Sequence, residues 1–217
     1  MLPRVEPVPK NAVLTLAGFI LLLLYSFQNR IPGITSLSRT VSYLIVAVFF
    51  VVAVLVFLPE LKRDVPLFFR RFPSYFGFFL PKFCVFLLIY YVVAFTLAVF
   101  IGEEAANQSV LKNYPLKVLV LLALFYAPIL EEILYRGFLR RLIHGKMLFI
   151  VVSSLFFAVI HMLHPGQSFA QLFYIFDYAL LGGFLAYLYV KTDNICVAML
   201  GHFSLNLLAL LPQLFLI

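Results

Sequence analysis

Two adjacent carboxylates, Glu131 and Glu132, lie inside a long apolar run, and Arg136 follows one helical turn later. A charged side chain at mid-bilayer depth costs roughly 2.5–3.5 kcal/mol on insertion scales, so it is rare there unless it is paired or functional. Glu132 and Arg136 are four residues apart with the acid first, the order that pairs best on a helix. Glu131 points about 100° away around the helix, where it can face another helix and take part in proton transfer.

Two other apolar stretches carry polar residues at helical spacing. His161 follows Phe157 by one turn, and Asn206 follows His202 by one turn. Counting about 1.5 Å per residue from the helix ends places Glu131, both histidines and Asn206 roughly 10–22 Å deep, in one band around the bilayer centre. A carboxylate can take a proton from water, an imidazole can hold that water and protonate a leaving amine, and His and Asn can stabilise an oxyanion. Together these residues predict hydrolysis.

Each residue alone has another interpretation. A single intramembrane His or Asn is more often a bond between helices than a catalyst. The Glu132–Arg136 pair could be purely structural, and one buried glutamate could be a proton relay in a transporter. Asp177 is a candidate hydrogen-bond partner without a motif, whereas Glu103 and Glu104 open a polar loop and are expected to be solvated.

The three spacings resemble the motifs of a known family. Glu131-Glu132-x-x-x-Arg136, Phe157-x-x-x-His161 and His202-x-x-x-Asn206 occur in this order, each in its own apolar stretch, near the C-terminal end. This ordered set is similar to the motifs of the CAAX protease and bacteriocin-processing (CPBP, Abi) family of intramembrane endopeptidases. Glu-Glu-x-x-x-Arg alone would be a weak signal.

The resemblance implies a role for each motif residue. Glu131 would be the general base that activates water with His161, while His202 and Asn206 would form the oxyanion hole. Glu132 with Arg136 would lock the helix, and Phe157 would line the site. The substrate implied is a peptide or protein, lipidated or membrane-bound. In the prenyl-processing branch it is a C-terminal tripeptide after a prenylated cysteine, and other bacterial members are linked to bacteriocin immunity or peptide maturation.

The cofactor requirement has two interpretations. Glu131, His161 and His202 could form a zinc site of two histidines and one carboxylate. The sequence has no His-Glu-x-x-His helix to support a zinc site, and His164 abuts Pro165-Gly166 at a loop edge. We therefore expect a glutamate-type peptidase without a cofactor, with Zn²⁺ as the alternative.

Composition fixes the class of protein. Of 217 residues, 65% are hydrophobic and 12% are charged, and the mean hydropathy is +1.09, against about 25% charged residues in soluble domains. We expect one all-α integral membrane domain over residues 1–217, a helical bundle with its active site at membrane depth and a motif-bearing core at about 116–217. A basic, Phe-rich segment at Val65–Lys82 lies in the interface or adds a broken eighth span. The seven predicted spans are Ala12–Phe27, Val41–Leu58, Phe83–Ile101, Val118–Leu139, Met147–Leu163, Gln171–Val190 and Ile195–Ile217.

The distribution of basic residues predicts the orientation. Eleven lie on one side of the predicted topology and four on the other, with Lys82 near a membrane border left uncounted, which puts the N-terminus in the cytoplasm. The expected location is a bacterial plasma membrane. The N-terminal run is expected to be a retained first helix rather than a cleaved signal. The eleven are Arg4, Lys10, Lys62, Arg63, Arg70, Arg71, Arg136, Arg140, Arg141, Lys146 and Lys191, and the four are Arg30, Arg39, Lys112 and Lys117.

The net charge of +7 fits cationic loops against an anionic lipid leaflet, so lipid is an expected partner and nucleic acid is not. Cys84 and Cys196 fall in apolar spans and are expected to be buried free thiols. The alternative function is a non-catalytic membrane scaffold or bacteriocin immunity factor that binds a partner protein. A transporter is a more distant alternative, because it would usually show broken helices in matching halves.

Overall fold

The computed structural model describes residues 12–27, 39–103, 105, 115–162 and 168–215. The described residues form helices and connections and contain no strand, which confirms the all-α prediction. Several predicted features lie outside them, namely Glu104, His164 and the basic residues Arg4, Lys10, Arg30 and Lys112.

The described residues of the N-terminal half form four helices. They are α1 (Ala12–Phe27), α2 (Arg39–Val56), α3 (Leu58–Arg70) and α4 (Phe72–Ile101). The chain bends by 79° between α2 and α3, and α3 is amphipathic, with Glu60 in its first turn and Arg70 in its last, as the helix dipole favours. Helix α4 ends where Gly102 adopts the left-handed conformation, with φ of 69°, and its N–H caps the Ala98 carbonyl.

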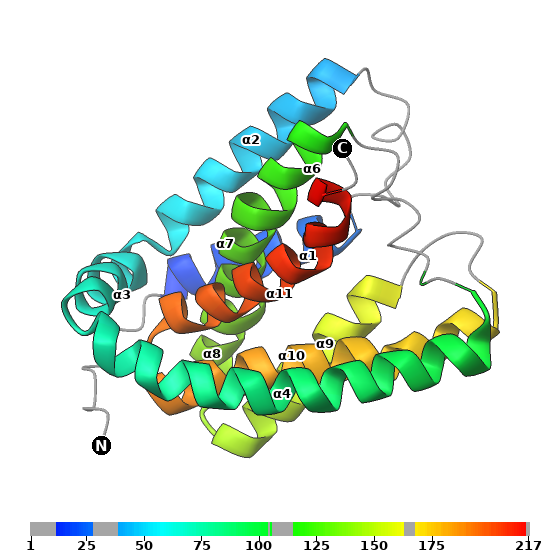
Figure 1. Cartoon of the computed structure of the whole chain (residues 1–217). Coiled ribbons are helices and arrows are strands. Elements are labelled where there is room, and N and C mark those ends of the chain that lie inside the picture. The colour runs from blue at the N-terminus through cyan, green and yellow to red at the C-terminus, as the bar shows by residue number, and fades with distance from the viewer. Residues whose placement is uncertain (1–11, 28–38, 104, 106–114, 163–167, 216–217) are drawn as a thin grey trace.

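The C-terminal half holds the three motifs. A continuous helix from Leu116 to Leu142 is followed by α9 (Lys146–Met162), a 3₁₀ turn at Ala170–Tyr174, α10 (Ile175–Thr192) and α11 (Ile195–Phe215). In Figure 1 the Leu116–Leu142 helix, labelled α6, α7 and α8, passes through the middle of the molecule, with α2 on one side and α4 on the other. Helix α10 packs against α9 and α11, and α9 and α11 pack against this central helix.

Every predicted span coincides with a helix, but the predicted number of membrane crossings is confirmed only in part. Four described helices are long and apolar enough to cross a membrane, or five if α2 and α3 form one bent span. Helices α1 and α9 are apolar but shorter. The interfacial segment predicted at Val65–Lys82 belongs to the end of α3 and the start of α4, and α4 begins eleven residues earlier than the predicted span because Pro73 is accepted in its first turn.

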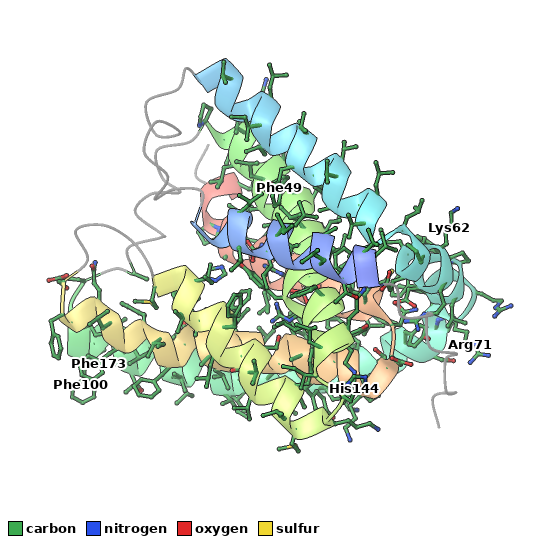
Figure 2. The ribbon with its side chains drawn as sticks, turned by 180° about the vertical axis from the view of Figure 1, so that it is seen from behind. Phe49, Lys62, Arg71, Phe100, His144 and Phe173 are labelled. Carbon is green, nitrogen blue, oxygen red and sulfur yellow. The ribbon has the colours of Figure 1, made fainter. Side chains whose placement is uncertain are left out.

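The outer helix faces are apolar, as expected for contact with lipid. On α4, Leu88, Phe95 and Phe100 are more than two-thirds exposed. Cys84 is exposed on the same helix, so the prediction of a buried thiol is wrong for Cys84, while Cys196 is half-buried; both thiols are free. Figure 2 shows Phe100 and Phe173 at one end of the molecule and the basic residues Lys62 and Arg71 at the other.

A group of four charged residues and one asparagine joins the helices at that basic end, and we call it the basic-end cluster: Glu60, Arg63, Asp64, Arg141 and Asn194. Arg141 donates to Glu60 Oε1 from Nε at 2.7 Å and to the carbonyls of Leu14 and Val56. Asp64 is completely buried and accepts from Arg63 Nε at 2.6 Å and from the Ile195 N–H at 2.8 Å. Asn194 caps α11 by accepting from the Cys196 N–H and donates to the Asp64 carbonyl. The cluster therefore fixes α3 against the ends of α1, α8 and α11.

Candidate active site

The central helix changes its hydrogen-bond register on both sides of the glutamate pair. It consists of α6 (Leu116–Leu121), a π-helical stretch at Leu122–Tyr126, α7 (Ala127–Glu132), a second π-helical stretch at Ile133–Phe138 and α8 (Leu139–Leu142). Isolated π turns inside α-helices are frequent at functional sites. The two glutamates occupy the short α-helical turn between them, and the segment from Leu130 to Leu139 is buried throughout.

Glu132 is held by two partners, and both are motif residues. Arg136 Nη1 lies 3.1 Å from Glu132 Oε1, and neither side chain is exposed, which agrees with the pairing expected from their spacing. His202 Nδ1 lies 2.9 Å from the same carboxylate oxygen. Arg136 also donates from Nη2 to the Gly182 carbonyl at 2.9 Å and stacks over the Phe157 ring. A buried charge needs such partners, so this network fixes the central helix against α9, α10 and α11.

Glu131 faces both motif histidines. Its Oε2 lies 3.6 Å from His161 Nε2 and 4.0 Å from His202 Nε2. The structure thus brings together side chains from α7, α9 and α11 that are separated by 30 to 71 residues in the sequence. We call Glu131, His161 and His202 the Glu131 cluster.

The hydrogen-bond partners assign the ring protons of both histidines. His161 Nδ1 is 2.8 Å from the Phe157 carbonyl, which can only accept, so Nδ1 donates. His202 Nδ1 lies 2.9 Å from Glu132 Oε1, an oxygen that also pairs with Arg136, so Nδ1 is the donor there as well. A neutral imidazole has only one ring proton, so Nε2 of each ring is an acceptor. The two acceptor nitrogens and the carboxylate oxygen of Glu131 therefore converge, as groups that receive protons from a water molecule would.

The remaining predicted residues surround this cluster. The Phe157 ring stacks on His161 with centroids 4.0 Å apart and meets His202 edge-on at 6.0 Å. Asn206 lies one turn beyond His202 on α11, and its Nδ2 donates to the Ala123 carbonyl at 2.7 Å. Asp177 accepts from the Tyr90 hydroxyl at 3.1 Å, as its suggested role as a hydrogen-bond partner requires. Glu103 is exposed, in line with the expected solvated loop.

Three groups around the site were not predicted from the sequence. The Tyr178 ring stacks on the face of His161 with centroids 5.1 Å apart. Backbone carbonyls of Ala123 and Gly182 hold Asn206 and Arg136. The pair Gly182-Gly183 inside an apolar stretch was an available signal, because small residues allow helices to approach closely. A Cβ atom built on Gly182 would lie 3.0 Å from Phe157 Cβ.

The donor types of the Glu131 cluster are those of a zinc site with two histidines and one carboxylate. Within the described part of the chain, however, no group of three His, Cys, Asp or Glu side chains is arranged to hold a metal ion. Metal independence stays a prediction.

The fold and the site define a helical membrane protein with a buried cluster of one glutamate and two histidines at the meeting point of three helices. Residues 112–208 match the sequence family described as "Type II CAAX prenyl endopeptidase Rce1-like", a range that contains all three motifs. The resemblance to the CAAX protease and bacteriocin-processing family is thereby confirmed for the motif-bearing part of the chain.

Two curated proteins are similar to part of the chain. One, named "Putative membrane peptidase YdiL" of Bacillus subtilis, is 29% identical over 121 residues, which are 52% of this chain and 46% of the relative. The other, an uncharacterized protein of Mycoplasma capricolum, is 33% identical over 105 residues, which are 47% of this chain and 29% of the relative. The chain thus matches less than half the length of each of these relatives. No solved structure is similar to it.

Proposed function

We propose that the chain is an intramembrane endopeptidase in which Glu131 activates a water molecule to hydrolyse a peptide bond. The observation that supports it best is the convergence of Glu131 Oε2 with the acceptor nitrogens of His161 and His202. The match to the prenyl endopeptidase family and the similarity to a relative named a putative membrane peptidase support the same function. The cluster brings one carboxylate and two imidazoles from three helices to one point, as general-base hydrolysis requires.

In the proposed reaction Glu131 first accepts a proton from water and later passes it to the leaving amine. Water held between Glu131 and His161 gives a proton to the Glu131 carboxylate while its oxygen attacks the substrate carbonyl carbon. Asn206 donates to the oxyanion that forms. His202 can donate from Nε2 only in its doubly protonated form, because its Nδ1 proton is committed to Glu132. The proton taken by Glu131 then passes to the leaving amine as the peptide bond breaks, and the acid and amine products separate.

The proposed substrate is a peptide or protein that reaches the site from the membrane, lipidated or membrane-bound. This follows from the buried position of Glu131 and from the prenyl endopeptidase description of the matching family. Membrane lipid is the surrounding partner. No cofactor is proposed, and nucleic acid has no part in the reaction.

The test is a cleavage assay on the purified full chain with a panel of lipidated and unlipidated peptides. We expect Glu131→Gln to lower kcat/KM by roughly 10²–10⁴-fold, the usual contribution of a general base. Glu103→Gln is the matched control, since it removes an exposed carboxylate outside the cluster, and it should cleave like the wild type. If no peptide is cleaved and a cellular phenotype survives Glu131→Gln, the chain is a scaffold or immunity factor instead.

The same assay decides the question of zinc. We expect cleavage to continue after extensive treatment with a chelator, because no step of the proposed reaction uses a metal. Loss of cleavage in the chelator, with recovery on adding zinc, would replace the glutamate mechanism with a zinc mechanism at the same three side chains.

A further inference from the structure

The π-helical stretch just before the glutamate pair leaves one backbone carbonyl without a helical donor. In the π-helical stretch Leu122–Tyr126 the hydrogen bonds step by five residues rather than four. At its end the Ala127 N–H donates to the Leu122 carbonyl. Pro128 follows directly and is buried within the first turn of α7.

These two residues remove both helical donors from the Ala123 carbonyl. In the α-helical register this carbonyl would accept from the Ala127 N–H, but Ala127 donates to Leu122 instead. In the five-residue register it would accept from residue 128, which is proline and has no N–H. A buried carbonyl that loses its helical donor needs another partner. The structure supplies one from α11, because Asn206 Nδ2 lies 2.7 Å from Ala123 O.

We propose that Pro128 is a positioning residue for Asn206: it keeps the Ala123 carbonyl open, so that this carbonyl anchors the Asn206 amide. The catalytic consequence rests on the function proposed above, in which Asn206 donates to the oxyanion. A side-chain amide nitrogen has two N–H groups. With one of them donated to Ala123, the direction of the other is fixed, and an oxyanion donor works best when its orientation is set before the reaction.

A structural role of Pro128 alone would predict something different. Pro81 also lies inside a helix, in α4, and takes no part in the contacts of the Glu131 cluster that the structure describes. A proline that only bends the central helix would alter stability and affect Asn206 no more than Pro81 does. Pro128→Ala and Pro81→Ala therefore form a matched pair, since each restores a backbone N–H inside a helix.

The first measurement does not depend on enzymatic activity. The full chain is labelled with ¹⁵N-asparagine in detergent micelles, and the Asn206 side-chain amide is assigned by its loss in Asn206→Ala. We expect Pro128→Ala to shift this amide resonance and to speed its hydrogen exchange, because the new N–H of residue 128 competes for the Ala123 carbonyl. Pro81→Ala should leave it in place. An unchanged Asn206 resonance in a folded Pro128→Ala protein overturns the proposal.

The second measurement is a double-mutant cycle. In the wild-type background Pro128→Ala should lower kcat by roughly ten- to a hundredfold, the effect of a small misplacement at a reacting group, with KM little changed. In the Asn206→Ala background Pro128→Ala should lower kcat no further and should raise the melting temperature, because the restored N–H then satisfies a carbonyl without a donor. Additive losses in kcat, or a lower melting temperature in that background, would refute the role of Pro128. If the wild type cleaves nothing, the proposed function fails, and the resonance and melting results still decide the contact.

Discussion

The basic-end cluster and the Glu131 cluster both bury carboxylates, but they differ in what faces each carboxylate. At the basic end, Glu60 and Asp64 meet donors: two arginines and a backbone N–H. In the Glu131 cluster the carboxylate faces two imidazole nitrogens that are themselves acceptors. The first arrangement joins helices through N–H donors, whereas the second brings together groups that can take a proton from a bound water molecule. Burial of charge therefore does not identify the site, and the balance of donors and acceptors does.

The largest difference between the two clusters should appear in stability. Arg141→Ala leaves Glu60 largely buried without its guanidinium partner, and breaking a buried ion pair typically costs about 3–5 kcal/mol. We expect a clear fall in the free energy of unfolding, measured by denaturant titration in mixed micelles. Arg70→Ala removes an exposed arginine from α3, the helix that carries Glu60, and should change this free energy by less than about 0.5 kcal/mol. Equal effects of the two substitutions would show that the basic-end cluster does not hold the helices together.

The Glu131 cluster should respond in the opposite direction. Glu131→Gln removes a negative charge from buried surroundings and can donate from its amide to one of the two imidazoles. An active site is often held at a cost in stability, so replacing one of its residues can leave stability unchanged or raise it. We expect the melting temperature to stay the same or rise while cleavage is lost. A strongly destabilised Glu131→Gln would place Glu131 with the structural carboxylates of the basic end.

The smallest effect concerns the packing behind the Glu131 cluster. Gly182→Ala places a methyl group 3.0 Å from Phe157 Cβ, and overpacking costs about 1–3 kcal/mol, against a gain of up to about 1 kcal/mol from helix propensity. We expect a net loss of about 1 kcal/mol and lower cleavage, because the Gly182 carbonyl holds Arg136. The control is Gly77→Ala, where a Cβ meets nothing within 4 Å. It should be neutral or stabilising in the same melting experiment.

The positions of the helices were predictable, because each apolar stretch is long enough to form a membrane helix. The seven predicted stretches all became helices, and the helix end at Ile101 follows from Gly102. The extent of α4 was not predictable in the same way, since Lys82 and Pro81 interrupt its hydropathy without interrupting the helix. The number of membrane crossings was harder to predict, because the sequence does not show where the membrane lies relative to each helix. Four or five described helices are long and apolar enough to cross it.

The site was predictable where side-chain spacing carries the information. The i,i+4 rule gave the Glu132–Arg136 pair, and a shared depth suggested that Glu131 meets His161 and His202. The backbone carbonyls of Ala123 and Gly182 were missed as partners. Every residue has a carbonyl, so residue type does not indicate which carbonyl binds a side chain. The assignment of the His202 proton to Glu132 was also missed, since it depends on the rotation of α11 about its own axis.

The bend between α2 and α3 determines how far Glu131 lies from the basic end of the molecule. Arg141 donates a hydrogen bond to Glu60 at the start of α3, so Arg141 on the central helix lies at the level of α3. Glu131 precedes Arg141 by ten residues on the central helix, a distance of about 15 Å along its axis. An extended chain advances about 3.3 Å per residue. For the peptidase proposed above, a peptide that entered from the basic end would have to extend about four to five residues past the level of Arg141 to place a bond at Glu131.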